Sequence, residues 1–161
     1  MLIRKATKAD VETIQSIAKI TWASTYTFLS NEQMDFMLDW MYSTTSLQQQ
    51  IKNGHQFYVA IADEIIVGFA SVSKEDENIC KLNKLYVLPS TQKTGAGKAL
   101  LQSVIDYAKE NEAKEIQLQV NRNNNAKDFY LKHGFAILYE ADFEIGNGFF
   151  MNDYVMSLKL S

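Results

Sequence analysis

Residues 85–101, LYVLPSTQKTGAGKALL, carry the most informative pattern in the sequence. A stretch that is typical of a β-strand runs into Pro89, and a polar loop with two glycines, Gly95 and Gly97, follows it. Behind the loop an apolar stripe recurs at helical spacing, formed by Leu100, Leu101, Val104, Ile105 and Ala108, and this predicts a helix that begins near Gly97. The order strand, glycine loop and helix predicts a site for an anion.

The glycine loop is expected to bind phosphate through its backbone. The N–H groups of residues 92–97 would converge in a turn, and the first helical turn adds unpaired N–H groups and a positive dipole end. A P-loop would need glycine in place of Gln92, and a Rossmann fingerprint starting at Gly95 would need a small residue in place of Leu100. A turn that merely joins strand to helix is the alternative.

Net charge, cysteine content and hydropathy exclude several classes of function. The 161 residues carry a net charge of −3, which argues against a general nucleic-acid binder. One cysteine, Cys80, excludes a disulfide framework, and His55 and His133 are far apart in the sequence, so we expect no metal site. We find no signal-like or membrane-spanning segment, and we therefore expect a cytoplasmic protein without a membrane partner.

Hydrophobic periodicity predicts a mixed α/β fold, with residues 1–161 forming a single domain. Possible capping boxes at Thr7 and Ser30 begin helices, a further short helix is expected over residues 45–53, and Ala126–Lys132 forms the last helix. In total we expect about four helices around a mostly antiparallel sheet of about seven strands with a central parallel pair. The strands are predicted near residues 2–6, 57–62, 65–72, 79–88, 116–120, 135–145 and 149–160.

The strand at residues 79–88 contains an irregularity. Cys80 and Leu82 place apolar side chains on even positions, whereas Leu85 and Val87 place them on odd ones. Strict alternation cannot change parity without an extra residue. A β-bulge is therefore predicted near Asn83-Lys84-Leu85.

A second motif lies in residues 120–135, VNRNNNAKDFYLKHGF. Its residues Asn125-Ala126, Phe129-Tyr130 and Gly134-Phe135 resemble a signature of the GNAT acetyltransferase superfamily, and the loop Q-x-x-G-x-G at residues 92–97 resembles that family's pyrophosphate-binding loop. Two motifs in the right order, separated by one helix and one strand, are more specific than either alone. The resemblance implies an enzyme that transfers the acetyl group of acetyl-CoA directly to a primary amine.

The resemblance also implies roles for individual residues. Tyr130 would protonate the departing thiolate, and a backbone N–H of the bulged strand would stabilise the developing oxyanion, a contribution worth about 2.7–4 kcal/mol in other enzymes. The cofactor would be bound by Leu85, Tyr86, Val87, Gln92, Lys93, Thr94, Gly95, Ala96, Gly97, Lys98, Asn125 and Lys132. Asn125 alternatively caps a helix, Lys132 alternatively is solvated, and Tyr130 alternatively is a core aromatic.

The acceptor side is less defined by the sequence. Many members of the family carry a glutamate near the positions of Lys81 and Asn83, where this chain has none, so the base that deprotonates the amine is unassigned. Trp22 and Tyr26, together with the carboxylates Glu140, Asp142 and Glu144, are candidates for binding a cationic acceptor; a solvated strand face is the alternative for the carboxylates.

The acceptor itself remains open among several amines. Weak similarity to bacterial polyamine acetyltransferases points to a polyamine, while an amino acid, an aminoglycoside-like molecule or a protein amine are alternatives. A different class of function is a non-catalytic acyl-CoA-binding regulatory module, against which Tyr130 argues. The protein is expected to be a monomer or a homodimer.

Overall fold

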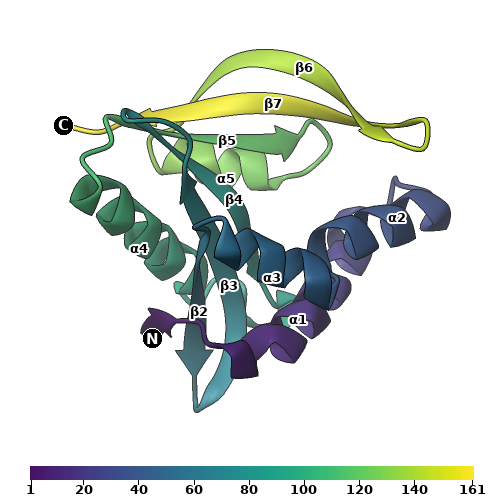
Figure 1. The fold of residues 1–161 in the computed structure, drawn as a ribbon, viewed down its shortest axis with the longest axis horizontal. Helices are drawn as coiled ribbons and strands as arrows, with labels where there is room; N and C mark the ends of the chain where they lie inside the picture. Colours follow the sequence, from purple (N-terminus) through teal and green to yellow (C-terminus); the bar gives the residue numbers. More distant parts are fainter.

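The computed structural model describes residues 1–161 and contains one seven-stranded mixed sheet with helices on both faces (Figure 1). The strands are β1 (Leu2–Lys5), β2 (Gln56–Ala62), β3 (Ile65–Lys74), β4 (Ile79–Val87), β5 (Glu115–Asn121), β6 (Ala136–Gly146) and β7 (Phe149–Lys159). The helices are α1 (Val11–Thr25), α2 (Asn31–Tyr42), α3 (Thr44–Lys52), α4 (Ala96–Glu110) and α5 (Ala126–Lys132). The predicted class and the seven strands are confirmed, and the helices number five instead of about four.

The sheet has the order β1-β2-β3-β4-β5-β7-β6, and all its neighbours are antiparallel except β4 and β5. This confirms the central parallel pair. The pair is short, because Ile79–Leu82 is matched only with Glu115–Leu118. Beyond these residues β4 continues beside β3, while β5 continues beside β7. In Figure 1 β5, β6 and β7 run across the top of the molecule, nearly crosswise to β2 and β3.

Two apolar cores lie on the two faces of the sheet. Leu100 and Val104 of α4 belong to one core, together with Ile116 and Leu118 of β5. On the other face α1, α2 and α3 pack on β2 and β3 around a second cluster, which includes Ile17, Trp22, Met37, Leu47, Val59 and Phe69. Figure 1 shows α4 on one side of β2 and β3 and α1 with α3 on the other.

The predicted β-bulge is confirmed at Asn83. Ser71 of β3 pairs with Lys84 and the next residue, Val72, pairs with Leu82, so Asn83 is the extra residue. Leu82 and Leu85 consequently both belong to the α4 core. Lys84 lies instead over the rings of Tyr42 and Phe57 in the other core.

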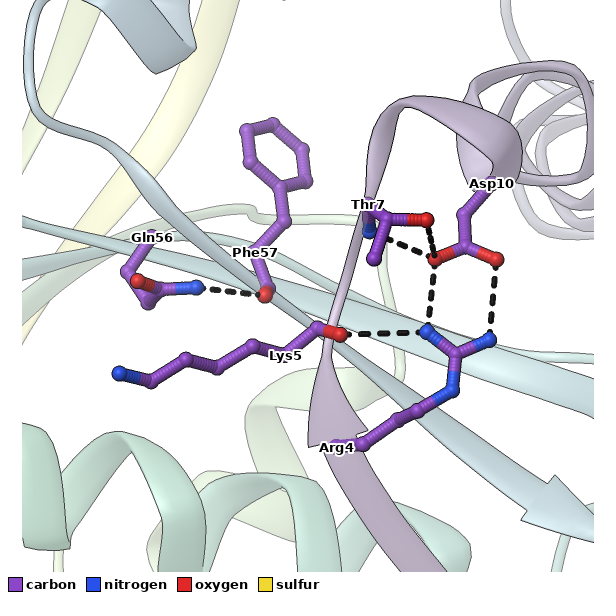
Figure 2. A network of polar contacts seen from close by, with 6 residues as sticks. All are labelled: Arg4, Lys5, Thr7, Asp10, Gln56 and Phe57. Carbon is purple, nitrogen blue, oxygen red and sulfur yellow. Dashed lines mark hydrogen bonds and ion pairs between the residues drawn. The ribbon is translucent and has the colours of Figure 1, made fainter.

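An ion pair fixes the entry into α1. Figure 2 shows the guanidinium of Arg4 facing the carboxylate of Asp10, with N–O distances of 2.8 and 3.0 Å. The same carboxylate accepts a hydrogen bond from the backbone N–H of Thr7 at 2.7 Å, as the predicted capping box requires. The bonds from Arg4 hold the pKa of Asp10 below its usual range, although burial opposes them.

Candidate active site

A cleft of about 820 Å³ opens where β4 and β5 separate. Its walls come from β4, the glycine loop, the start of α4, β5, α5 and the end of α1. The sequence-predicted site residues that line it are Tyr26, Leu85, Tyr86, Val87, Gln92, Lys93, Gly95, Gly97, Lys98, Asn125, Tyr130 and Lys132. The tertiary structure therefore brings the two sequence motifs together in one cavity.

The glycine loop presents unpaired backbone donors at one end of the cleft. Four consecutive N–H groups, those of residues 95–98, have no hydrogen-bond acceptor in the protein, and the ladder of α4 starts with the bond from Ala99 N–H to Gly95 O. Gln92 attaches the loop to β4, because its Nε2 donates to the carbonyl of Val87 at 3.2 Å. Such an array of donors at a helix N-terminus is suited to a phosphate group.

The two glycines of the loop have different reasons for being glycine. Gly95 has a φ of +90°, a left-handed conformation that L side chains rarely adopt. Gly97 lies within α4, and a Cβ atom there would be 3.4 Å from Phe129 Cε1. Gly97 does not have a positive φ, and its lack of a side chain leaves room for α4 to pack closely on α5.

Two predicted residues of the loop contribute no side chain to the cleft. The hydroxyl of Thr94 donates to the carbonyl of Thr91. The side chain of Ala96 is buried in the α4 core, so only its unpaired backbone N–H remains for a ligand.

The cleft is cationic. Lys93 and Lys98 line it at the glycine loop, Lys132 lines it on α5, and no aspartate or glutamate is among its lining residues. This charge suits a long, anionic ligand whose phosphate groups meet the unpaired N–H groups. The residues present therefore fit a phosphate-bearing molecule that extends from the loop along β4.

Tyr130, on α5, lines the cleft and carries a phenol hydroxyl. Its side chain is buried, with 6% exposed, and packs edge to face on Phe129 and Phe135. Its hydroxyl forms no hydrogen bond within the protein although it borders the cleft. Burial, and to a smaller extent the neighbouring Tyr26, raises the pKa of Tyr130, so the phenol keeps its proton.

A polar network joins Tyr26 to two further residues that line the cleft. The hydroxyl oxygens of Tyr26 and Tyr86 are 3.0 Å apart, and Asn124 Nδ2 donates to Tyr26 at 3.4 Å. Asn124 also accepts from Ala126 N–H at 2.9 Å, so it caps α5. Asn125 has no capping bond and lines the cleft, as its predicted role requires.

Other predicted acceptor residues lie outside the cleft. Trp22 is buried behind Tyr26, with ring centroids 4.8 Å apart, and supports that tyrosine from within the core. Glu140 and Asp142 on β6 both accept hydrogen bonds from Arg122, and their ladder partners are Tyr154 and Asn152. The geometry gives no support to these carboxylates as the acceptor site.

Sequence reasoning missed two buried charged residues. Lys84 lines the cleft, donates to Gln50 Oε1 at 2.7 Å, and has a pKa lowered by burial to about 8. Asp153 on β7 is almost completely buried, and burial raises its pKa to about 6. The position of Asp153 between Met151 and Val155 in a period of two was the available signal, since it predicts a carboxylate on the inward face.

A cluster of metal-ligating side chains would indicate a metal centre, and a long apolar helix would indicate a membrane span. No group of three or more histidine, cysteine, aspartate or glutamate side chains is positioned to hold a metal ion. None of the helices combines the length and the apolar character needed to cross a bilayer.

The known proteins that this chain resembles in sequence are described as acetyltransferases. A family model described as an acetyltransferase (GNAT) domain matches residues 26–158. A spermidine N(1)-acetyltransferase of Thermoplasma acidophilum is 30% identical over 144 residues, which are 84% of this chain and 88% of the relative. An uncharacterized N-acetyltransferase of Mycobacterium tuberculosis is 39% identical over 99 residues, 61% of this chain; the match spans 63% of that relative's length.

Among solved structures, the crystal structure of PaiA N-acetyltransferase from Thermoplasma acidophilum in complex with coenzyme A has a TM-score of 0.84. The two sequences are 28% identical, and the alignment covers 99% of this chain and 98% of the other. The similarity therefore extends over both cores and the whole cleft.

Proposed function

Because the chain belongs to the GNAT acetyltransferase family, we propose that it transfers the acetyl group of acetyl-CoA directly to a primary amine of a small molecule. The observation that carries this proposal is the arrangement of one cleft: unpaired backbone donors at the glycine loop, and a protonated phenol with no internal partner on α5. Acyl transfer needs both an anchor for the phosphates and an acid for the thiolate.

The anchor is formed by the N–H groups of residues 95–98 together with Lys93, Lys98 and Lys132. When bound, acetyl-CoA supplies the activated acetyl group. The free side of β4 after Leu82 faces the opening toward β5, where it would align the cofactor's amide groups by backbone hydrogen bonds. Binding energy at the loop would thereby orient the thioester for attack by the amine.

Tyr130 is the proposed proton donor to sulfur. A phenol with a raised pKa stays protonated at neutral pH, and it borders the cleft without competing internal hydrogen bonds. General-acid catalysis by such a group typically contributes about 10²–10⁴-fold to the rate. This intact donor favours an enzyme over the alternative of a non-catalytic acyl-CoA-binding module.

A polyamine is the proposed acceptor. The support comes from the relative in Thermoplasma acidophilum that is described as a spermidine N(1)-acetyltransferase. An amino acid, an aminoglycoside-like molecule and a protein amine are the competing acceptors. The cytoplasmic location and the monomeric or dimeric state that we expect from the sequence stay predictions.

Thiol release tests the proposed function. The protein is incubated with acetyl-CoA and, separately, with spermidine, putrescine, lysine, kanamycin and a lysine-containing peptide, and free CoA is measured with a thiol reagent. We expect amine-dependent release with spermidine above the others. Tight acetyl-CoA binding with no release for any amine would instead identify a binding module.

A further inference from the structure

β7 carries a carboxylate that has no partner within the protein. Asp153 is 1% exposed, neither of its oxygens hydrogen-bonds to another residue, and Oδ1 is shielded from solvent. All four ion pairs of the structure involve other carboxylates. A buried unpaired carboxylate is costly, and a catalytic role or a bound cation or water is among the reasons for which native structures retain one.

Asp153 lies at the open end of the separation between β4 and β5. Its ladder partners are Asn121, the last residue of β5, and Ala141 of β6. Its charge contributes to raising the pKa of Tyr26, and Tyr26 in turn contributes to raising the pKa of Tyr130. Tyr26 is therefore the shared neighbour of the unpaired carboxylate and of the proposed acid.

A second, smaller pocket lies one step of the β5–β7 ladder from Asp153, which does not itself line it. It has a volume of about 90 Å³, and its lining includes Gln119 and Val155, the cross-strand pair two residues from Asn121 and Asp153. Tyr139 and Phe143 of β6 complete an apolar and aromatic wall. The space suits about three water molecules, or the end of an alkylamine.

No nearby cation neutralises Asp153. Arg122 is the first residue after β5, and its guanidinium is bound to Glu140 and Asp142. Lys81 lines the small pocket but makes no ion pair. Both charges favour the ionised carboxylate, yet burial outweighs them and raises its pKa to about 6. The phenol of Tyr26 feels the charge of Asp153, and the neighbouring small pocket adds the phenol of Tyr139 and the carboxylate of Glu75.

We propose that Asp153 receives the ammonium group of the acceptor and accepts its proton, which leaves the free amine for attack. The inference rests on the proposed function and names the base that the sequence left unassigned. A cation is the partner that the unpaired carboxylate lacks. A carboxyl group that titrates near neutrality is also suited to general-base work, because it binds and releases protons at physiological pH.

The proposed reaction removes two protons from the ammonium group and replaces a carbon–sulfur bond with a carbon–nitrogen bond. The ammonium gives one proton to Asp153, which later releases it to solvent. The amine nitrogen forms a bond to the thioester carbonyl carbon, and the carbon–sulfur bond breaks with its electron pair on sulfur. Tyr130 gives its proton to that sulfur and is reprotonated by the second proton of the attacking nitrogen. The products are the acetylated amine, CoA as its thiol and one proton in solution.

The test compares wild type with Asp153→Asn, which keeps the shape and removes the charge. With spermidine as acceptor we expect kcat/KM for the amine to fall by roughly 10²–10⁴-fold, while the KM for acetyl-CoA stays within twofold. Asp106→Asn, which removes an exposed carboxylate on α4, is the matched control and should leave both values unchanged.

A pH profile separates a proton acceptor from a structural residue. In wild type, log kcat/KM for the amine should bend downward below about pH 6, where Asp153 becomes protonated, in addition to the slope from the amine itself. Asp153→Asn should lack this bend. An unchanged rate and an identical profile in the variant would overturn the inference and leave the proposed function intact.

If wild type transfers acetyl to no amine, the proposed function fails. The role of Asp153 as a cation site is then tested by a binding measurement. Spermidine is then titrated calorimetrically into CoA-saturated wild type and Asp153→Asn. Weaker binding to the variant by at least tenfold supports Asp153 as the cation site. Equal affinities, or no binding to wild type, overturn it.

Discussion

A Cβ atom on Gly97 would lie 3.4 Å from Cε1 of Phe129, so the first turn of α4 packs directly on α5. This contact joins the two sequence motifs: one helix presents the unpaired N–H groups, and the other carries Tyr130. The anion anchor and the proposed acid are consequently held by the same helix pair. Substitutions at this junction should affect binding more than folding.

Valine at either loop glycine should weaken acetyl-CoA binding. Gly95→Val imposes a left-handed conformation on a β-branched residue, which costs on the order of 1–3 kcal/mol, and relief of that strain would turn the N–H groups away from the phosphate. Gly97→Val would press on Phe129. Calorimetric titration with acetyl-CoA should show affinity losses of roughly tenfold or more for both variants.

Gly54 offers a matched control for the strain at Gly95. It has a φ of +95°, no neighbouring atom within 4 Å, and a position at the end of α3 away from the cleft. Gly54→Val should lose similar stability and keep wild-type affinity for acetyl-CoA. Unchanged affinity in folded Gly95→Val would contradict the backbone anion site.

Tyr130→Phe should lower kcat by roughly 10²–10⁴-fold. Phenylalanine keeps the packing on Phe129 and Phe135, and the hydroxyl has no internal hydrogen bond to lose. The melting temperature and the acetyl-CoA affinity should therefore stay close to wild type. A loss of stability with normal turnover would identify a purely structural tyrosine.

The Tyr130→Phe defect should also shrink as pH rises from 6 to 10. The raised pKa of Tyr130 keeps the wild-type phenol protonated over this range, whereas a CoA thiolate needs less help from an acid at high pH. Rate profiles of wild type and variant measure the difference. Parallel curves would mean that the tyrosine positions the cofactor without donating a proton.

Asp10→Asn should destabilise the protein by roughly 1–2 kcal/mol at pH 7, less than a fully buried pair would lose because Arg4 is partly exposed. The Asp10 pKa is lowered in the folded state, so the carboxylate's contribution is present above its unfolded pKa and is lost as pH falls through its folded pKa. Denaturant unfolding should show the gap between wild type and variant closing in acid. A constant gap from pH 7 to pH 2 would exclude the charged pair as its cause.

Lys84→Met should change the alkaline stability profile. Burial lowers the pKa of Lys84 to about 8, so its charge destabilises the folded state below that pH, and wild type should gain stability as pH rises from 8 to 10.5. Because the difference in pKa between the folded and the unfolded state is coupled to stability, this gain in the free energy of unfolding is on the order of 3 kcal/mol. The methionine variant should lack this gain, and Lys109→Met, at an exposed position on α4, should retain it. An unaltered profile in Lys84→Met would contradict the buried charge.

Local patterns in the sequence determined most of the fold. The parity change between Leu82 and Leu85 predicted the bulge that the structure has at Asn83, because alternation along a strand is a local property. The same holds for α5, whose boundaries at Ala126 and Lys132 match the prediction. Hydrogen bonding and periodicity within a few residues set these features, and no distant contact is needed to anticipate them.

Which side chains meet was decided by the tertiary structure. The sequence separates Tyr26 from Asn124 by 98 positions and from Tyr86 by 60, and only the crossing of α1 over the sheet brings their polar atoms within 3.4 Å. The pairing of Arg122 with Glu140 and Asp142 likewise depends on how β5, β7 and β6 align. The isolation of Asp153 depends on burial from several elements at once, and no local pattern encodes the cost of removing a charge from water.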